Sequence, residues 1–374
     1  MAPRISYQFH GGRPRTGAAA NVVGGGGGGG GGFDHNSVQV INGSFPAKPD
    51  VGAGVGPAII YDDCSGSSVT TLWSGGWPDG SGAPYDLSYS TSINSVAMAH
   101  SHVSKYMRGC ATPGGLANTG NAVMAWKNRT ISSFTAKTYM SWYYMADPNW
   151  VTQTYGGTGA DDGNYKLYDF STGTSPYDPA NWYTSGHLGV DTQRVWNDDD
   201  GALDNPDRNG NNFFGITGPS YYAWQKSELE ISHDTTNNGY INWYENGVLN
   251  SKTPASGHSY YGHTIGGTLT GSAFNDSVGG YNRAYGPTTQ WRYWNDVVLD
   301  YTLERLLLTN SSTFASSTIL EYQEVTAWGT TQITFKAKLG QFSVGQTGYL
   351  WVVGANGITG SPAPALHSSV TIGS

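Results

Sequence analysis

Charged residues, cysteines and long apolar runs are all scarce in this sequence, and each shortage excludes a class of protein. Charged residues make up 12% of the 374 residues, while the 54 glycines, 25 tyrosines and 13 tryptophans suit strands and turns better than helices. The only cysteines, Cys64 and Cys110, are too few for a disulfide scaffold, and their separation matches no zinc pattern. They are either a pair across neighbouring strands or two buried free thiols. The composition predicts an all-β protein.

Membrane and nucleic-acid partners have no support in the sequence. No run of about 18 apolar residues is present, which excludes a transmembrane helix. The N-terminal residues also lack the continuous apolar core of a secretory signal. The formal net charge of -8 gives no basis for binding nucleic acid or an anionic membrane. We therefore expect a protein that is made in the cytoplasm without a secretion signal.

The N-terminal residues 1–32 contain three cations and no acidic residue, and they end in nine consecutive glycines. The cations are Arg4, Arg13 and Arg15. A polyglycine tract buries nothing and loses the most backbone entropy on ordering, so it should be flexible by itself. Two interpretations stay open, namely a linker and a basic anchoring arm that orders only against an acidic partner surface or along an oligomer axis.

Short runs rich in aromatic and β-branched residues follow, separated by Gly, Asn and Pro turns. Residues 33–50 hold one alternating stretch, 37–41, which is either a small strand or part of a connector. In residues 240–249, Asn246-Gly247 supplies the positive φ angles of a tight hairpin turn. Further strands are predicted at residues 58–61, 138–146, 165–170, 227–232, 291–300, 331–339 and 349–353.

Three segments resemble the concanavalin A-like lectin/glucanase superfamily, which includes laminin-G-like modules and jelly-roll polysaccharide lyases. They are AIIYDD at 58–63, SELEISHDTTNNGYINWYENGVL at 227–249 and WRYWNDVVLD at 291–300. The tail from residue 301 is similar to an immunoglobulin-like domain of the IPT/TIG type. The resemblance implies a jelly-roll β-sandwich over 51–305 and a small immunoglobulin-like β-domain over 306–374, behind a glycine-rich arm and linker of residues 1–50.

An acidic loop is the best candidate metal site. Its D-x-D-G-x-x-D-x-x-D spacing resembles calcium loops of the thrombospondin type 3 kind, in which hard oxygen ligands at short intervals surround the ion. No Glu stands at the twelfth position, which excludes an EF-hand. The alternative is a solvated loop with Asx-turns. The ligands predicted for calcium are Asp198, Asp200, Asp204, Asp207 and Asn209.

Three other pairs could contribute ligands. Asp63 and Asp296 are candidates for a second ion site between the first and last strands of the sandwich. His100 and His102 stand two residues apart, so on a strand they would face the same side, but no third ligand accompanies them. A hydrogen-bonded or solvated histidine pair is therefore the preferred interpretation, and the same holds for the last pair, His258 and His263.

Glu228 and Glu230 have the alternating spacing with which retaining glucanases of this fold present carboxylates to a cleft. The third acid of that pattern is misplaced, because Asp234 lies four residues further on. Against the alginate-lyase pattern, Lys226 stands near Glu228 where an Arg is expected, and no Gln-x-His partner is present. We therefore predict a protein that is not an enzyme, with the two glutamates on its surface.

Carbohydrate binding is the more plausible activity, because flat aromatic side chains are what sugar rings stack on. The neighbours Trp243 and Tyr244 cannot both point inward from a strand, so one of them should be exposed or at an interface. The candidate binding residues are Trp142, Tyr144, Trp224, Trp243 and Tyr244.

Together these features predict a non-enzymatic surface protein of a phage virion, serving as capsid decoration, head fibre or tail adhesin. The arm would anchor it to other virion proteins, the jelly roll would meet host-surface glycans, and cell lysis would release it. A symmetric homo-oligomer, with a trimer favoured, is expected of such an edge-rich sandwich. The alternatives are a jelly-roll polysaccharide lyase or glycoside hydrolase, and a carbohydrate-binding module of a bacterial surface protein.

Overall fold

The chain is described by a computed structural model in which four sheets dominate. The described residues are 23–24, 32–51, 53–73, 75–76, 88–91, 98–111, 121–130, 137–146, 165–172, 182–188, 192–197, 216–217, 223–232, 240–249, 273–282 and 290–373. Within these ranges the only helical turns are two 3-10 turns, Val69–Thr71 and Phe314–Ser316. No helix among them is long and apolar enough to cross a membrane. The predicted all-β class is confirmed.

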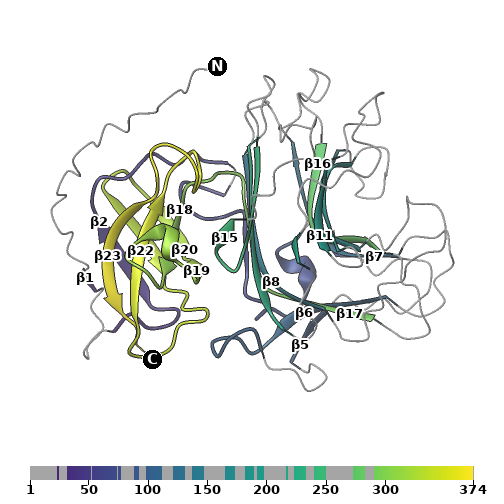
Figure 1. Ribbon diagram of the computed structural model, residues 1–374, viewed down its shortest axis with the longest axis horizontal. Helices are drawn as coiled ribbons and strands as arrows, with labels where there is room; N and C mark the ends of the chain where they lie inside the picture. The colour runs from purple at the N-terminus through teal and green to yellow at the C-terminus, as the bar shows by residue number, and fades with distance from the viewer. Residues whose placement is uncertain are drawn as a thin grey trace, which may run out of the picture.

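Two sheets form a large jelly-roll sandwich (Figure 1). The eight-stranded sheet runs in the order β15 (Val248–Leu249), β14 (Tyr240–Glu245), β13 (Gln225–Ser232), β8 (Lys137–Ala146), β17 (Gln290–Asp300), β6 (Tyr106–Ala111) and β5 (Ser88–Ser90), with β3 (Ile60–Asp62) also paired to β17. The seven-stranded sheet runs β12 (Ile216–Thr217), β11 (Thr192–Asn197), β10 (Trp182–Leu188), β9 (Tyr165–Thr172), β16 (Ala273–Asn282), β7 (Asn121–Thr130) and β4 (Gly75–Gly76).

Two four-stranded sheets form the small sandwich. One runs β1 (Val23–Gly24), β2 (Val38–Asn42), β21 (Gln332–Lys336) and β20 (Glu324–Trp328). The other runs β19 (Leu320–Tyr322), β18 (Arg305–Thr309), β22 (Thr347–Val353) and β23 (Ala365–Thr371). All strand pairs in the four sheets are antiparallel.

The core of the large sandwich comes from alternate residues of its central strands. On β8, Met140, Trp142 and Tyr144 point into a buried cluster between the two sheets, and Val278 of β16 joins it from the seven-stranded sheet. The intervening residues of β8 point to the opposite face, as the period of two in a strand requires. They are also buried. The eight-stranded sheet is therefore covered on both faces.

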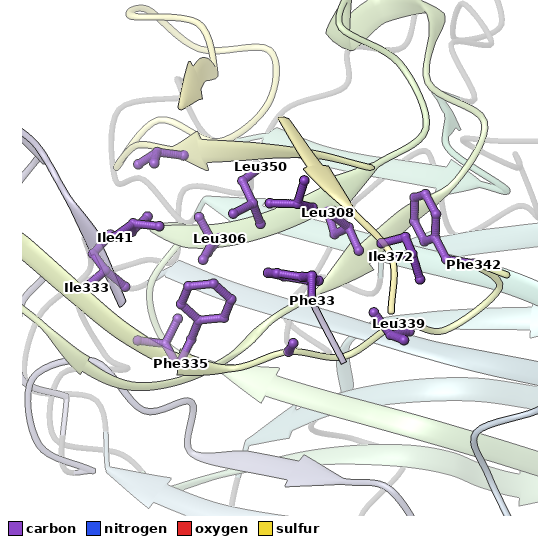
Figure 2. Close-up of a cluster of buried hydrophobic side chains, with 14 of the residues drawn as sticks. Phe33, Ile41, Leu306, Leu308, Ile333, Phe335, Leu339, Phe342, Leu350 and Ile372 are labelled. Atoms are coloured by element: carbon purple, nitrogen blue, oxygen red, sulfur yellow. The ribbon is translucent and has the colours of Figure 1, made fainter. Parts of the chain in front are cut away.

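The small sandwich is built from both ends of the described chain. Ile41 of β2 pairs with Ile333 of β21, and Phe33 forms a parallel bridge with Ile372. Figure 2 shows Phe33 and Ile41 packed in one core with residues more than 260 positions away, such as Leu306. The boundary expected at residue 50 therefore does not follow the packing. Residues 33–45 belong to the small sandwich, and the large sandwich is an insertion within it.

The outer face of the eight-stranded sheet packs against the small sandwich, with β18 and β19 on the side facing β15 (Figure 1). β18 is buried on both faces, because Leu306 and Leu308 fill the core of the small sandwich while Leu307 packs toward the large one. The Asn246-Gly247 hairpin forms as predicted, with φ of 48° and 77°. At Gly247 a Cβ would lie 2.4 Å from Leu320 Cδ1, so glycine is needed there for the close approach as well as the turn.

Candidate functional site

Glu228 and Glu230 are both buried beneath the small sandwich, which corrects their expected place on the surface. They point from β13 toward the outer face of the eight-stranded sheet, and the small sandwich covers that face. Glu230 Oε1 lies 2.6 Å from Arg305 Nη2 and also accepts a hydrogen bond from the backbone N–H of Ile358. Tyr139 donates a hydrogen bond of 2.6 Å to Glu228. Glu230 therefore joins the two sandwiches, and both glutamates are buried away from solvent.

A second buried ion pair lies beside the first. Lys226 Nζ is 3.5 Å from Glu321 Oε2, and the hydroxyl of Tyr143 donates a short hydrogen bond to the same carboxylate. Lys48, from the segment after β2, lies 2.6 Å from Asp300 of β17. Charges this deeply buried require partners, because an unpaired charge out of water is strongly unfavourable. The ion pairs between the sandwiches therefore define their relative position as well as holding them together.

The predicted histidine pair is hydrogen-bonded, and the described residues around it form no group of three or more metal ligands. His100 Nε2 lies 2.5 Å from Asp296 Oδ2, while the backbone N–H of His102 donates to His100 Nδ1. The ring of His102 stacks on His35 at 4.6 Å between centroids. Burial, helped by the nearby charges of His102 and Lys338, lowers the pKa of His35 to about 4. This cluster is a further polar contact between the sandwiches.

Of the pair predicted to form a second ion site, Asp296 contacts His100 and Asp63 lies near a lysine, so the site stays a prediction. Burial raises the pKa of Asp296, but the charge and hydrogen bond of His100, together with the charges of Lys226 and Lys338, outweigh this effect, and the net pKa is below its ordinary value. The cation nearest to Asp63 is Lys338, with 3.8 Å between Oδ2 and Nζ. Among the described residues, no group of three or more potential ligands is placed to hold a metal ion. Cys64 is a buried free thiol.

Four of the five aromatic residues expected to bind carbohydrate are instead buried in the packing. Trp142, Tyr144 and Trp243 lie in the core of the large sandwich, out of reach of a ligand. Tyr244 points to the other face, where its hydroxyl reaches Glu230. The prediction that Trp243 and Tyr244 do not both point into the core is confirmed. Trp224 alone is partly exposed, beside a small buried cluster around Tyr106, Met145 and Tyr293.

Several predicted site residues lie outside the described ranges. They are the calcium ligands Asp198, Asp200, Asp204, Asp207 and Asn209, the arm residues Arg4, Arg13 and Arg15, the pair His258 and His263, and Asp234.

A cleft of about 500 Å³ opens where the two sandwiches meet. The large sandwich contributes the end of β3, the loop after it and Tyr89 of β5. The small sandwich contributes Asn36, Glu324, Lys336 and Lys338. This volume falls within the range of about 300–1,000 Å³ that is typical of small-molecule sites. Its walls carry side chains of both charges, together with hydroxyl groups and aromatic rings.

The large-sandwich wall of the cleft is held by one buried carboxylate. Asp62 Oδ2 accepts hydrogen bonds of 2.8 Å from Trp73 Nε1 and 2.7 Å from the Tyr89 hydroxyl. Asp62 Oδ1 accepts another from the backbone N–H of Cys64. Burial raises the pKa of Asp62, and these three hydrogen bonds act in the opposite direction. Because Asp62 already has three donors, its role is to fix the wall, and the more exposed neighbours are left to meet a ligand.

The small-sandwich wall is fixed by one glutamate that forms ion pairs with two lysines. Glu324 lies 2.8 Å from Lys336 and 3.0 Å from Lys338 through its two carboxylate oxygens. Lys338 also donates to Asn36 and lies over the ring of Tyr61. Sequence reasoning missed this wall, since the pattern of residues 331–339 predicts a strand but does not say what it faces. The Asp62-Asp63 pair in AIIYDD was the only local signal.

Neither a protein-family model nor a curated protein matches the chain. Among solved structures, the endo-beta-1,4-glucuronan lyase from the fungus Trichoderma reesei is similar over 66% of this chain and 96% of its own, at 12% identity and a TM-score of 0.41. Cellulose induced protein Cip1 is similar over 65% and 97%, at 13% identity and 0.40. The carbohydrate recognition domain of Emp46p, in its potassium-bound form, is similar over 52% and 82%, at 13% identity and 0.33.

Proposed function

We propose that this protein is a non-catalytic virion surface protein that displays a carbohydrate-binding large sandwich. The observation that carries the proposal is the insertion topology. The small sandwich contains both Phe33 and Ile372, so the N-terminal arm and the C-terminus leave from the same unit. An arm attached there can anchor the small sandwich to a particle and leave the large sandwich free to meet glycans.

The rigid junction supports a role in display. Buried ion pairs such as Glu230–Arg305 and Lys48–Asp300 orient the large sandwich on its base. A displayed module benefits from such fixed orientation, because less conformational freedom is lost when it binds. The same junction favours a function without catalysis. The small sandwich covers the strand face on which Glu228 and Glu230 would otherwise present a carboxylate pair to a polysaccharide.

Polysaccharide binding and turnover can be measured on the same samples. The full chain is incubated with a panel of neutral and acidic polysaccharides, and retention is followed together with reducing ends and the absorbance of unsaturated products. We expect retention without new ends or products. Turnover of any polysaccharide would contradict the proposal and favour a lyase or hydrolase.

Anchoring is tested on particles produced without this protein. Full chain and a variant lacking residues 1–31 are mixed with such particles, and co-sedimentation is measured. The variant loses the two-residue edge strand β1 but keeps Phe33 and the buried core cluster of the small sandwich, so that core should still form. We expect only the full chain to sediment with the particles. Equal attachment of the two would overturn the anchoring role of the arm.

A further inference from the structure

We propose that the cleft between the two sandwiches is the carbohydrate site and that it takes a short neutral oligosaccharide. This inference rests on the proposed carbohydrate binding and names the place and ligand class for it. The cleft is formed by Asp63, Ser65, Leu72 and Tyr89 on one side and by Glu324 and Lys336 on the other.

The charge of the cleft favours a neutral ligand. Three carboxylates line it, on Asp62, Asp63 and Glu324, against two ammonium groups, on Lys336 and Lys338. An anionic sugar would meet this excess of negative charge, and both ammonium groups already have a carboxylate partner in Glu324. A neutral ligand avoids this repulsion.

The hydrogen-bonding groups of the cleft match sugar hydroxyls, which donate and accept at once. Asp63 and Lys336 are the two most available charged groups, because their side chains are 37% and 43% exposed. Asp63 can accept from one hydroxyl while Lys336 donates to the next, and charged hydrogen bonds of this kind are the stronger ones. Between them, the partly exposed Tyr89 and the exposed Leu72 offer apolar surface to the carbon face of a ring.

The cleft is also organised before any ligand arrives. Asp62 holds Tyr89 on one wall and is itself held by the buried Trp73, and Glu324 holds both lysines on the other wall. Groups held in this way lose little freedom when they bind, which raises affinity for a given set of contacts. Because the walls belong to different sandwiches, the site exists only in the assembled full chain.

Filling the cleft is the most direct test. Ser65 is exposed and its polar contacts to Asp63 and Lys105 are made by backbone atoms, so Ser65→Trp adds bulk while keeping them. Ser312→Trp, on an exposed loop of the small sandwich, is the matched control. The samples are titrated calorimetrically with cellotetraose, maltotetraose and chitotetraose, and with a galacturonate tetrasaccharide as the acidic comparison. We expect Ser65→Trp to weaken neutral binding about tenfold or more and Ser312→Trp to leave it unchanged.

Conservative amide substitutions give a second test that does not depend on a bulky side chain. Asp63→Asn and Lys336→Gln remove one charge each and should each weaken binding about tenfold. Asp50→Asn is the control for the first, because Asp50 is exposed, lies outside the cleft and, like Asp63, accepts a backbone hydrogen bond. Unchanged melting temperatures show that each variant is folded.

The outcomes separate the cleft from the broader function. If the full chain binds a neutral oligosaccharide and all three cleft variants bind it as tightly as the full chain does, the cleft proposal is overturned and carbohydrate binding stands. If the full chain binds none of the sugars, the proposed function and the cleft assignment both fail. Tighter binding of the galacturonate tetrasaccharide, lost in Ser65→Trp, would keep the cleft but overturn its neutral ligand class.

Discussion

The two faces of the eight-stranded sheet are made by the same strands but are held to their neighbours in different ways. The inner face presents Met140, Trp142 and Trp243 to an apolar core, where area removed from water provides the stability. The outer face adds buried ion pairs to its apolar contacts, including Glu230 with Arg305. Apolar contacts tolerate small shifts, whereas a buried pair requires matched geometry. The inner face therefore mainly stabilises the sheet, while the outer face also specifies where the small sandwich sits.

Two buried carboxylates, one on each face of the sheet, differ in the direction of their pKa shift. Glu245 projects to the side of Trp243 and Ser227, and burial raises its pKa to about 8 despite hydrogen bonds from both residues. Asp296 lies among His100, Lys226 and Lys338, whose charges outweigh its burial and lower its pKa. The outer face supplies counter-charges that the inner face lacks.

The largest expected effect comes from removing the N-terminal part of the small sandwich. Deleting residues 1–46 removes Phe33, Ile41 and Phe45 from its core. Each large core side chain contributes about 2–5 kcal/mol, so the three together approach the entire stability of a typical domain, about 5–15 kcal/mol. We expect the small sandwich to unfold and the outer face to lose its cover, seen as a lost thermal transition and binding of a hydrophobic dye. The chain lacking residues 1–31 is the control, and equal melting of the two truncations would contradict the shared core.

Arg305→Met should be the most damaging single change on the outer face. It leaves Glu230 buried without its cation, and breaking such a pair is unfavourable by about 3–5 kcal/mol. The loss is measured by urea unfolding.

The double variant Arg305→Met with Glu230→Leu should recover much of this loss, because both charges are then gone. The single variant Glu230→Leu completes the comparison. If the stability lost in the double variant equals the sum of the losses in Arg305→Met and Glu230→Leu, the ion pair is not what couples the sandwiches.

Glu245→Gln should stabilise the protein at alkaline pH. The wild-type group ionises near its ordinary value when unfolded but near pH 8 when folded, so wild-type stability falls as pH rises from about 4.5 to 8. Glutamine keeps an acceptor for Trp243 and Ser227 and does not ionise. We expect a gain on the order of 1–2 kcal/mol at pH 8 and none at pH 4, from urea unfolding at the two pH values. An equal gain at both pH values would rule out ionisation as the cause.

The smallest effect concerns His35 of the small sandwich, whose ring stacks on His102 of the large one. Its folded pKa of about 4 lies below the ordinary 6.5, so the unfolded chain binds the proton more tightly and stability falls as pH drops from about 6.5 to 4. His35→Asn keeps an acceptor for the backbone N–H of Leu339. It should reduce the loss of stability between pH 6.5 and 4 by about 1 kcal/mol, a value lowered for the partial exposure of the ring. Thermal unfolding across this pH range measures it, and parallel curves for the two proteins would contradict it.

Local patterns identified the three central strands of the eight-stranded sheet, whose outer face carries the buried glutamates. The predicted runs 138–146, 227–232 and 291–300 correspond to β8, β13 and β17, and the Asn246-Gly247 turn forms where expected. The role of Glu228 and Glu230 could not be read in the same way. Alternation shows that they share a face, but exposure depends on what covers that face, and the cover comes from residues 305–358.

The sequence alone determined the all-β class, the positions of ten of the 23 described strands and the alternation of inward and outward residues along them, because these depend on periods of two and on turn chemistry within a few residues. Only the tertiary structure decided that residues 33–45 complete the small sandwich, that the glutamates are buried ion-pair partners and that a polar cleft opens at the junction. Each of these depends on contacts between segments far apart in the chain, such as β2 with β21 and β13 with β18. Such contacts are selected by the global packing of faces and charges, which no local pattern records.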